Sequence, residues 1–257
     1  MSLDILGKID HTIPGKQNPL SGNGKTVMPP EDDLEICLRP TSFIDSDSPS
    51  IAAFAKQSIG DAKGDVEKAV KLFYAVRDEI RYDPYNISLT REWLRASSTL
   101  RRGYGYCVAK AVVLTAAARA VGIPARLGFA DVINHLATER LRRVMQTDIF
   151  AWHGFTELFL EGRWVKATPT FNISLCRRFG VKPLEFDGRH DALFHEYDSR
   201  GNRHIEYVRY HGSYADLPYD TILEGFRKYY PAYFREDGSM ITGNFEKEAG
   251  KDRKGKE

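Results

Sequence analysis

The stretch RRGYGYCVAKAVVLTAAARAVGIPAR, residues 101–126, decides the fold of this chain. Its glycines permit a tight loop, and the run from Cys107 to Val121 is apolar on nearly every side. A helix with so little polar surface is expected in the centre of a domain. Because Gly122 suits a left-handed helix end and Pro124 prevents continuation, the helix should end near residue 121. The stretch therefore predicts a buried central helix that begins with a cysteine.

A β-rich region follows this helix. Residues 125–133 (ARLGFADVI) predict a strand. Residues 152–160 (WHGFTELFL) and 163–170 (RWVKATPT) are joined by the turn-forming pair Glu161-Gly162, which predicts an antiparallel hairpin. His153 and Thr168 lie at opposite ends of this hairpin's sequence, so they are candidates for cross-strand neighbours.

The rest of the chain is expected to wrap around this core as one domain with extensions. The domain should span residues 48–235, preceded by an N-terminal arm at 1–47 and followed by a charged, disordered tail at 236–257. Further elements are predicted from periodicity and turn signals: helices at 65–81, 91–98 and 219–230, a loop with a helical turn at 134–147, a strand at 34–40, and a second hairpin formed by 192–198 and 204–212.

Composition narrows the class of protein. A chain of 257 residues with 42% hydrophobic content and a formal charge of +2 suggests neither a nucleic-acid-binding surface nor a membrane span. The first residues have no signal-peptide core, so we expect a cytoplasmic protein. Cys37, Cys107 and Cys176 are an odd number without CxxC spacing, which argues for free thiols and against a structural zinc site. The oligomeric state does not follow from the sequence.

Cys107 and His153 are the residues that could carry chemistry. The free amides and the dipole at a helix N-terminus stabilise a thiolate, although a helix-start cysteine can also be a small apolar core residue. A strand histidine such as His153 is usually structural. Catalysis by a Cys-His pair requires the imidazole within hydrogen-bond reach of the sulfur and a third group on its other nitrogen.

Residues 65–175 resemble the transglutaminase-like superfamily. The resemblance rests on GYCVAKAVVLTAAARAVGIPAR, WHGFTEL and RWVKATPT, which occur in the family's order. It implies an α+β, papain-like fold in which a central helix bearing the catalytic cysteine packs on an antiparallel sheet bearing the histidine. Cys107 and His153 match the motif, whereas Thr168 stands where the family has aspartate. Thr168, Asn172 or Asp131 could then orient His153.

The resemblance implies cysteine-dependent acyl transfer or hydrolysis on a peptide, isopeptide or glutamine amide, through a thioester at Cys107 and without a cofactor. The Cys107 amide and one of Tyr82, Tyr104 or Tyr106 could form an oxyanion hole. One alternative is a catalytically decayed binding or scaffold domain, since threonine carries no charge to stabilise an imidazolium. Another is an interaction protein that docks through the aromatic residues 195–219.

Two other signals are weak. The string SGNGKT lacks the leading glycine and the preceding strand of a phosphate-binding loop. Four histidines in the C-terminal part have no compact ligand spacing, so no metal site is predicted; they are His190, His195, His204 and His211.

Overall fold

The computed structural model describes residues 31–135, 137–194, 205–231, 245 and 248. Helices and strands alternate along this part of the chain, and a mixed α+β arrangement results, as predicted. The helices are α1 (Glu31–Ile36), α2 (Pro49–Ile59), α3 (Asp65–Glu79), α4 (Arg91–Leu94), α5 (Ala96–Arg102), α6 (Cys107–Ala120), α7 (Glu139–Met145), α8 (Ile173–Phe179) and α9 (Tyr219–Tyr229). The strands are β1 (Arg81–Tyr82), β2 (Tyr104–Gly105), β3 (Ala125–Asn134), β4 (Ile149–Leu160), β5 (Arg163–Ala167) and β6 (Ile205–Tyr214).

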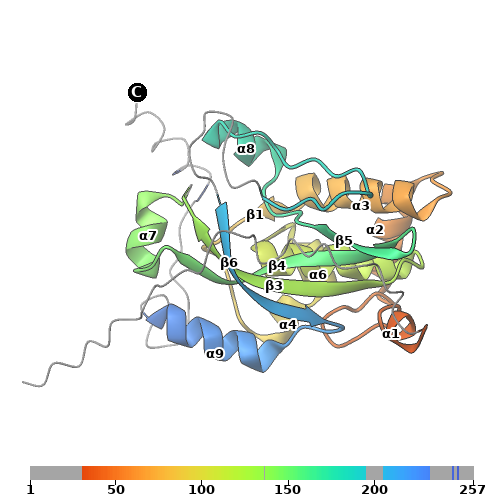
Figure 1. The fold of residues 1–257 in the computed structure, drawn as a ribbon, viewed down its shortest axis with the longest axis horizontal. Coiled ribbons are helices and arrows are strands. Elements are labelled where there is room, and N and C mark those ends of the chain that lie inside the picture. Colours follow the sequence, from red (N-terminus) through yellow and green to blue (C-terminus); the bar gives the residue numbers. More distant parts are fainter. Residues whose placement is uncertain (1–30, 136, 195–204, 232–244, 246–247, 249–257) are drawn as a thin grey trace, which may run out of the picture.

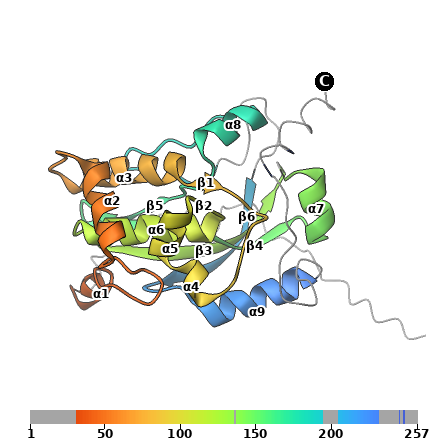
Figure 2. The ribbon, with the colours of Figure 1, turned by 180° about the vertical axis from the view of Figure 1, so that it is seen from behind.

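The main sheet of the described residues has the strand order β5-β4-β3-β6, with every neighbouring pair antiparallel. Figure 1 shows β6 crossing in front of the sheet's end, with α9 below it and α7 beside it. Figure 2, from behind, shows α2, α3, α5 and α6 on the opposite side. The central helix α6 is thus enclosed between the sheet and an outer layer of helices.

Helix α6 is buried along nearly its whole length, as its apolar sequence predicts. It begins at Cys107, and Gly122 follows its end with a φ of 83°, the left-handed conformation expected there. Its two long basic side chains donate hydrogen bonds to backbone carbonyls: Lys110 Nζ to the carbonyl of Ile80 at 2.6 Å, and Arg119 Nε to that of Ala125 at 2.9 Å. Buried polar groups with such partners avoid most of the cost of desolvation.

Strands β4 and β5 form the predicted hairpin around Glu161 and Gly162, both of which have positive φ. Their pairing ends at Thr156 opposite Ala167. Beyond this point the Thr168 amide donates to the carbonyl of Ala192 instead. Thr168 is therefore not paired with His153 across the hairpin, contrary to the arrangement that the sequence suggested.

Two further expectations differ from the structure. Residues 34–40 were expected to form a strand, but the chain forms α1 and then a turn; the acidic sequence EDD at its start favours a helix N-terminus. The second hairpin is also wrong for the described residues, because β6 pairs with β3 and Ala192 bridges Ala167. Strand β3 otherwise has an open edge, and β6 satisfies its hydrogen-bonding groups.

The ends of the chain lie largely outside the described residues, and the division into arm, domain and tail stays a prediction. Within the expected tail, Phe245 is buried against Tyr82 and Tyr85, and Glu248 accepts a hydrogen bond from the Tyr85 hydroxyl at 2.5 Å. These two residues contact the folded domain. In the part of the chain that the structure covers, no helix has the length and apolar character of a membrane span.

Candidate active site

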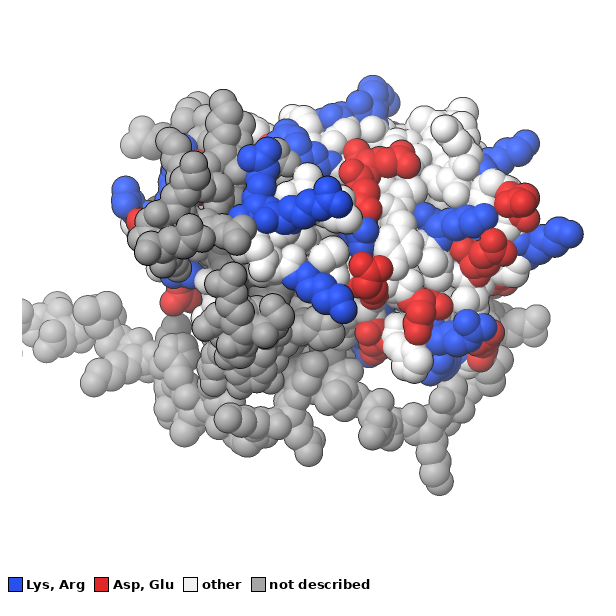
Figure 3. Space-filling model, turned by 90° about the horizontal axis from the view of Figure 1, so that it is seen from above, with Lys and Arg blue, Asp and Glu red and all other residues white. Residues whose placement is uncertain are grey.

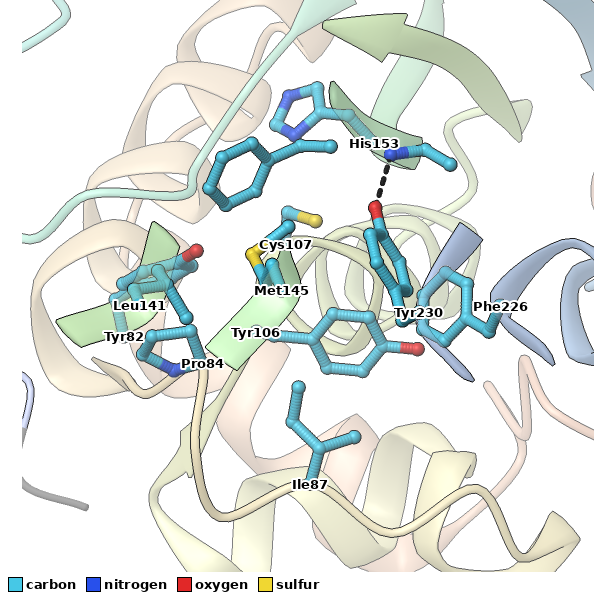
Figure 4. Close-up of a pocket in the computed structure, with 12 residues that line it drawn as sticks. Tyr82, Pro84, Ile87, Tyr106, Cys107, Leu141, Met145, His153, Phe226 and Tyr230 are labelled. Carbon is cyan, nitrogen blue, oxygen red and sulfur yellow. Dashed lines mark hydrogen bonds between the residues drawn. The ribbon is translucent and has the colours of Figure 1, made fainter. Parts of the chain in front are cut away.

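One pocket lies where the N-terminus of α6 meets β4. Cys107 and His153 both line it, and Figure 4 shows the two side chains facing the same space. The cavity has a volume of about 60 Å³. Its walls come from regions far apart in the sequence, namely β1 and the loop after it, α7, β4 and the end of α9, with Tyr82, Pro84, Ile87, Tyr106, Leu141, Met145, Phe150, Ala151, Phe226 and Tyr230 completing the lining.

Close packing between α6 and β4 brings the two candidate residues together. A Cβ atom added to Gly154 would lie only 2.9 Å from the Val108 Cα, so any larger residue after His153 would push the helix away. The Gly154 amide and the first amides of α6 are hydrogen-bond partners of the Cys107 sulfur, and they act to lower the pKa of its thiol. The structure thus places the Cys107 thiol at the N-terminus of α6, as the sequence predicted.

Desolvation nevertheless dominates the ionisation of Cys107. Burial raises the pKa of the Cys107 thiol to about 11, more than the amides lower it. The side chain is only half-buried and lies on the pocket wall, whereas Cys37 and Cys176 are buried away from it. All three cysteines are free. Cys107 is therefore a reachable thiol that stays protonated at neutral pH in this state.

His153 lies in an apolar environment. Its ring is 5.5 Å from that of Phe194 and 6.3 Å from that of Tyr207, measured between centroids. Burial lowers the pKa of the His153 imidazole to about 3. Its Nε2 atom is buried without a hydrogen-bond partner among the described residues. The imidazole is thus neutral, and no described carboxylate compensates for its burial.

Thr168, the residue at the family's aspartate position, is buried and lies next to Tyr207, a neighbour of His153. Its hydroxyl makes no hydrogen bond of regular geometry within the described part of the chain, and the group that it interacts with is the Tyr207 hydroxyl. Tyr207 lies between His153 and Thr168, with its ring facing His153. Burial raises the pKa of the Tyr207 hydroxyl, and the interaction with Thr168 lowers it in part. Tyr207 did not stand out in the sequence, because a tyrosine on a strand is most often a packing residue.

The two other candidates for orienting His153 are engaged elsewhere. Asn172 caps the start of α8; its Oδ1 atom accepts the Tyr82 amide at 3.1 Å, and its side-chain nitrogen donates to the Ser174 hydroxyl at 2.6 Å. Asp131 accepts a hydrogen bond from the Trp152 amide at 3.0 Å and pairs with His211 Nε2 at 2.7 Å. Neither side chain is bonded to His153.

The pairing of Asp131 fixes the backbone next to His153. Asp131 lies at a bulge in β3, and Trp152 has a φ of 57°, which is unfavourable for a residue other than glycine. The Trp152 ring stacks on His211 with centroids 4.1 Å apart and planes 9° from parallel. Gly225 leaves room for this ring, because an added Cβ there would lie 2.3 Å from the Trp152 Nε1. Asp131 and His211 together hold the strained residue that precedes His153.

Of the three tyrosines considered for an oxyanion hole, Tyr82 and Tyr106 line the pocket and Tyr104 does not. The Tyr104 ring packs under the guanidinium groups of Arg81 and Arg102. The Tyr106 hydroxyl is buried without a partner among the described residues, and Figure 4 shows it pointing away from Cys107. On the opposite wall, the Tyr230 hydroxyl accepts a hydrogen bond from the Ala151 amide and so holds β4 in place.

The remaining histidines of the described ranges do not line the candidate site. His190 pairs with Asp187 at 2.7 Å, whereas His195 and His204 lie outside the described residues. In the described ranges, no three His, Cys, Asp or Glu side chains are grouped as a metal site would require. Figure 3 shows positive and negative side chains side by side on the face seen from above.

Comparisons with known proteins agree with the motif. Residues 52–169 match the family model of the transglutaminase-like superfamily. No curated protein matches the chain. A solved structure of a proposed cysteine protease from Cytophaga hutchinsonii is 17% identical with a TM-score of 0.44, over 72% of this chain and 47% of that protein. A proposed protease from Parabacteroides distasonis is 16% identical with a TM-score of 0.36, over 53% of this chain and 26% of that protein.

The chain thus spans less than half the length of either solved protein. The match to the family model includes α6, the β3–β4–β5 sheet and both candidate residues of the pocket. Residues 52–169 of this chain, which include both candidate residues, therefore match the transglutaminase-like superfamily.

Proposed function

We propose that this protein is a cysteine enzyme that hydrolyses or transfers the acyl group of a peptide or protein amide through a thioester at Cys107. The observation that carries the proposal is the shared pocket of Cys107 and His153 at the N-terminus of α6. Family membership supports the same chemistry. The three free thiols fit a reducing compartment, so we expect the enzyme to act in the cytoplasm.

The reaction would proceed in two stages. The Cys107 sulfur attacks the amide carbonyl carbon while its proton passes to the neutral imidazole of His153, and a carbon–sulfur bond forms. His153 then returns that proton to the leaving nitrogen, and the carbon–nitrogen bond breaks. Water, or a second amine, attacks the thioester and regenerates the Cys107 thiol. The amides at the start of α6 would stabilise the oxygen of the tetrahedral intermediate.

The resting pocket favours the neutral forms of both groups. Because the pKa of Cys107 is about 11 and that of His153 about 3, transfer of the proton between them would cost on the order of 10 kcal/mol, before mutual attraction of the ions offsets part of it. The enzyme would therefore need proton transfer coupled to the attack. Thr168 is our candidate for orienting His153, because it stands where the family has aspartate and interacts with Tyr207, whose ring faces His153.

The same observation favours a second candidate function, a binding or scaffold domain without catalysis. A histidine enclosed by Phe194 and Tyr207, with no carboxylate bonded to it, is what a decayed site would retain. In that case the pocket would bind a ligand without forming a covalent bond to it.

Trapping of the acyl-enzyme separates the two functions. The protein is mixed with p-nitrophenyl acetate, and intact mass and peptide mapping locate any added acetyl group. One acetyl per chain at Cys107, removed by hydroxylamine and absent in Cys107→Ala, is the expected result. Cys176→Ala serves as the control, because Cys176 is buried away from the pocket. Absence of acetylation at Cys107 would leave the scaffold function.

A further inference from the structure

The described residues that line the pocket beside Cys107 include no charged side chain. None of its twelve lining residues is Lys, Arg, Asp or Glu, and His153 is neutral above pH 3 because of burial. Most of the wall consists of aliphatic and aromatic side chains, including Leu141, Met145 and Phe150. A carboxylate or ammonium that entered this space would lose its hydration without gaining an ion pair, which costs several kcal/mol in proteins.

The size of the cavity limits the length of the group that it holds. An apolar protein cavity of about 150 Å³ binds benzene, which corresponds to roughly 25 Å³ for each carbon. The volume of about 60 Å³ beside Cys107 therefore accommodates two or three carbons.

The position of the cavity determines which part of the substrate enters. Cys107 and His153 form part of its wall, so a group in the cavity lies beside the carbon attacked by the sulfur. We propose that the preferred acyl donor carries a short, uncharged aliphatic group of two or three carbons on its reacting carbonyl, and that this group binds in the pocket. The proposal rests on the acyl-transfer function above and adds the substrate class.

A series of p-nitrophenyl esters tests the length of the acyl group while the leaving group stays constant. The rate of p-nitrophenolate release is measured for acetyl, butyryl, hexanoyl and octanoyl esters and divided by the rate with free cysteine. Each buried methylene contributes about 0.8 kcal/mol, or about fourfold, so butyryl should react about 15-fold faster than acetyl. Hexanoyl and octanoyl should be no faster than butyryl. A flat series, or rates that rise steadily to octanoyl, would overturn the proposal.

Thiol-directed reagents test the preference for an uncharged group without requiring catalysis. Propyl, 2-sulfonatoethyl and 2-(trimethylammonio)ethyl methanethiosulfonates have chains of similar length and differ in charge. After division by their rates with free cysteine, the propyl reagent should modify Cys107 at least about tenfold faster than either charged reagent, because desolvation penalises both charges. Equal rates for all three would contradict the proposal.

Two variants in one loop provide a matched pair. Ile87 lines the pocket, whereas Leu89, two residues later, does not; both side chains are half-buried. Ile87→Ala enlarges the cavity, so the fastest ester should shift from butyryl to hexanoyl. Leu89→Ala should keep the wild-type order. A shift in both variants, or in neither, would show that this pocket does not select the acyl group.

Failure of this proposal is distinguishable from failure of the enzyme function. If the methanethiosulfonates modify Cys107 but no ester acylates it, the thiol is reachable and the proposed acyl transfer is wrong. If esters acylate Cys107 without regard to chain length, acyl transfer stands and the substrate class is wrong. Cys107→Ala provides the background rate in both experiments.

Discussion

Two histidines on strands of one sheet differ in how their burial is compensated. His211, on β6, is bonded to the Asp131 carboxylate and stacks on Trp152, but it does not line the pocket. His153, on β4, lines the pocket and packs against the rings of Phe194 and Tyr207, and its Nε2 atom has no hydrogen-bond partner among the described residues. The Asp131 carboxylate is thus bonded to His211, the histidine that does not share the pocket with the thiol. The difference indicates that Asp131 serves the geometry of the backbone, and it leaves the ring of His153 for the role of base that we propose.

The sharpest test of this comparison exchanges each histidine for glutamine. His153→Gln removes the proposed base, which should lower the rate of acyl-enzyme formation by about 10³-fold. His211→Gln should lower it less than tenfold, because His211 has no part in proton transfer. Stopped-flow measurement with p-nitrophenyl butyrate compares both variants with the wild type. Similar losses at both positions would remove the functional distinction between them.

Acid should weaken the fold through His153. The imidazole has a pKa of about 3 in the folded protein and 6.5 in an unfolded chain, so below pH 6.5 only the unfolded chain takes up this proton. The free energy of unfolding should therefore fall as the pH falls from 6.5 towards 3, by roughly 5 kcal/mol at the limit.

Urea unfolding at pH 7, 6 and 5 measures this loss. In His153→Gln the part due to His153 is absent, so the variant should lose about 2 kcal/mol less than the wild type between pH 6.5 and 5. An unchanged pH dependence would mean that His153 is not buried as a neutral group.

Removal of the carboxylate should affect the paired histidine. Asp131→Ala leaves the Trp152 amide and His211 without their acceptor, and hydrogen bonds to a charged group contribute about 1.5–3 kcal/mol each. We expect a loss of about 3 kcal/mol in the free energy of unfolding and a lower kcat at unchanged KM. Asp131→Asn retains an acceptor and should lose about half as much. Equal losses in both variants would show that the Trp152 amide needs no acceptor.

Introducing a carboxylate should make His153 resemble His211. Thr168→Asp places the family's residue at this position, and a nearby carboxylate should raise the pKa of His153 by about 1–2 units. Thr168→Asn, which has nearly the same shape without the charge, is the control. Titration of the ring nitrogens by NMR measures the shift. If Thr168→Asp leaves the pKa of His153 unchanged, Thr168 is not the residue that orients it.

The sequence predicted the elements whose signals are local. The apolar run after Cys107 gave the bounds of α6, and Glu161-Gly162 gave the β4–β5 hairpin. Both patterns depend on residues that are neighbours in the chain. Strand β6 was assigned to the wrong partner, because its bonds to β3 join residues about 80 positions apart, and periodicity carries no information on partners at that distance.

The candidate site also has parts that the sequence predicted and parts that only the structure showed. Order and motif identified Cys107 and His153, since a helix-start cysteine and a strand histidine followed by glycine are visible in the sequence. Only the tertiary structure showed that Asp131 bonds to His211 and that α7 and α9 complete the pocket. Local apolar patterns determine which segments form helices and strands, whereas burial and hydrogen-bond partners depend on contacts between distant segments. For that reason the protonation states of Cys107 and His153 could be decided only by the fold.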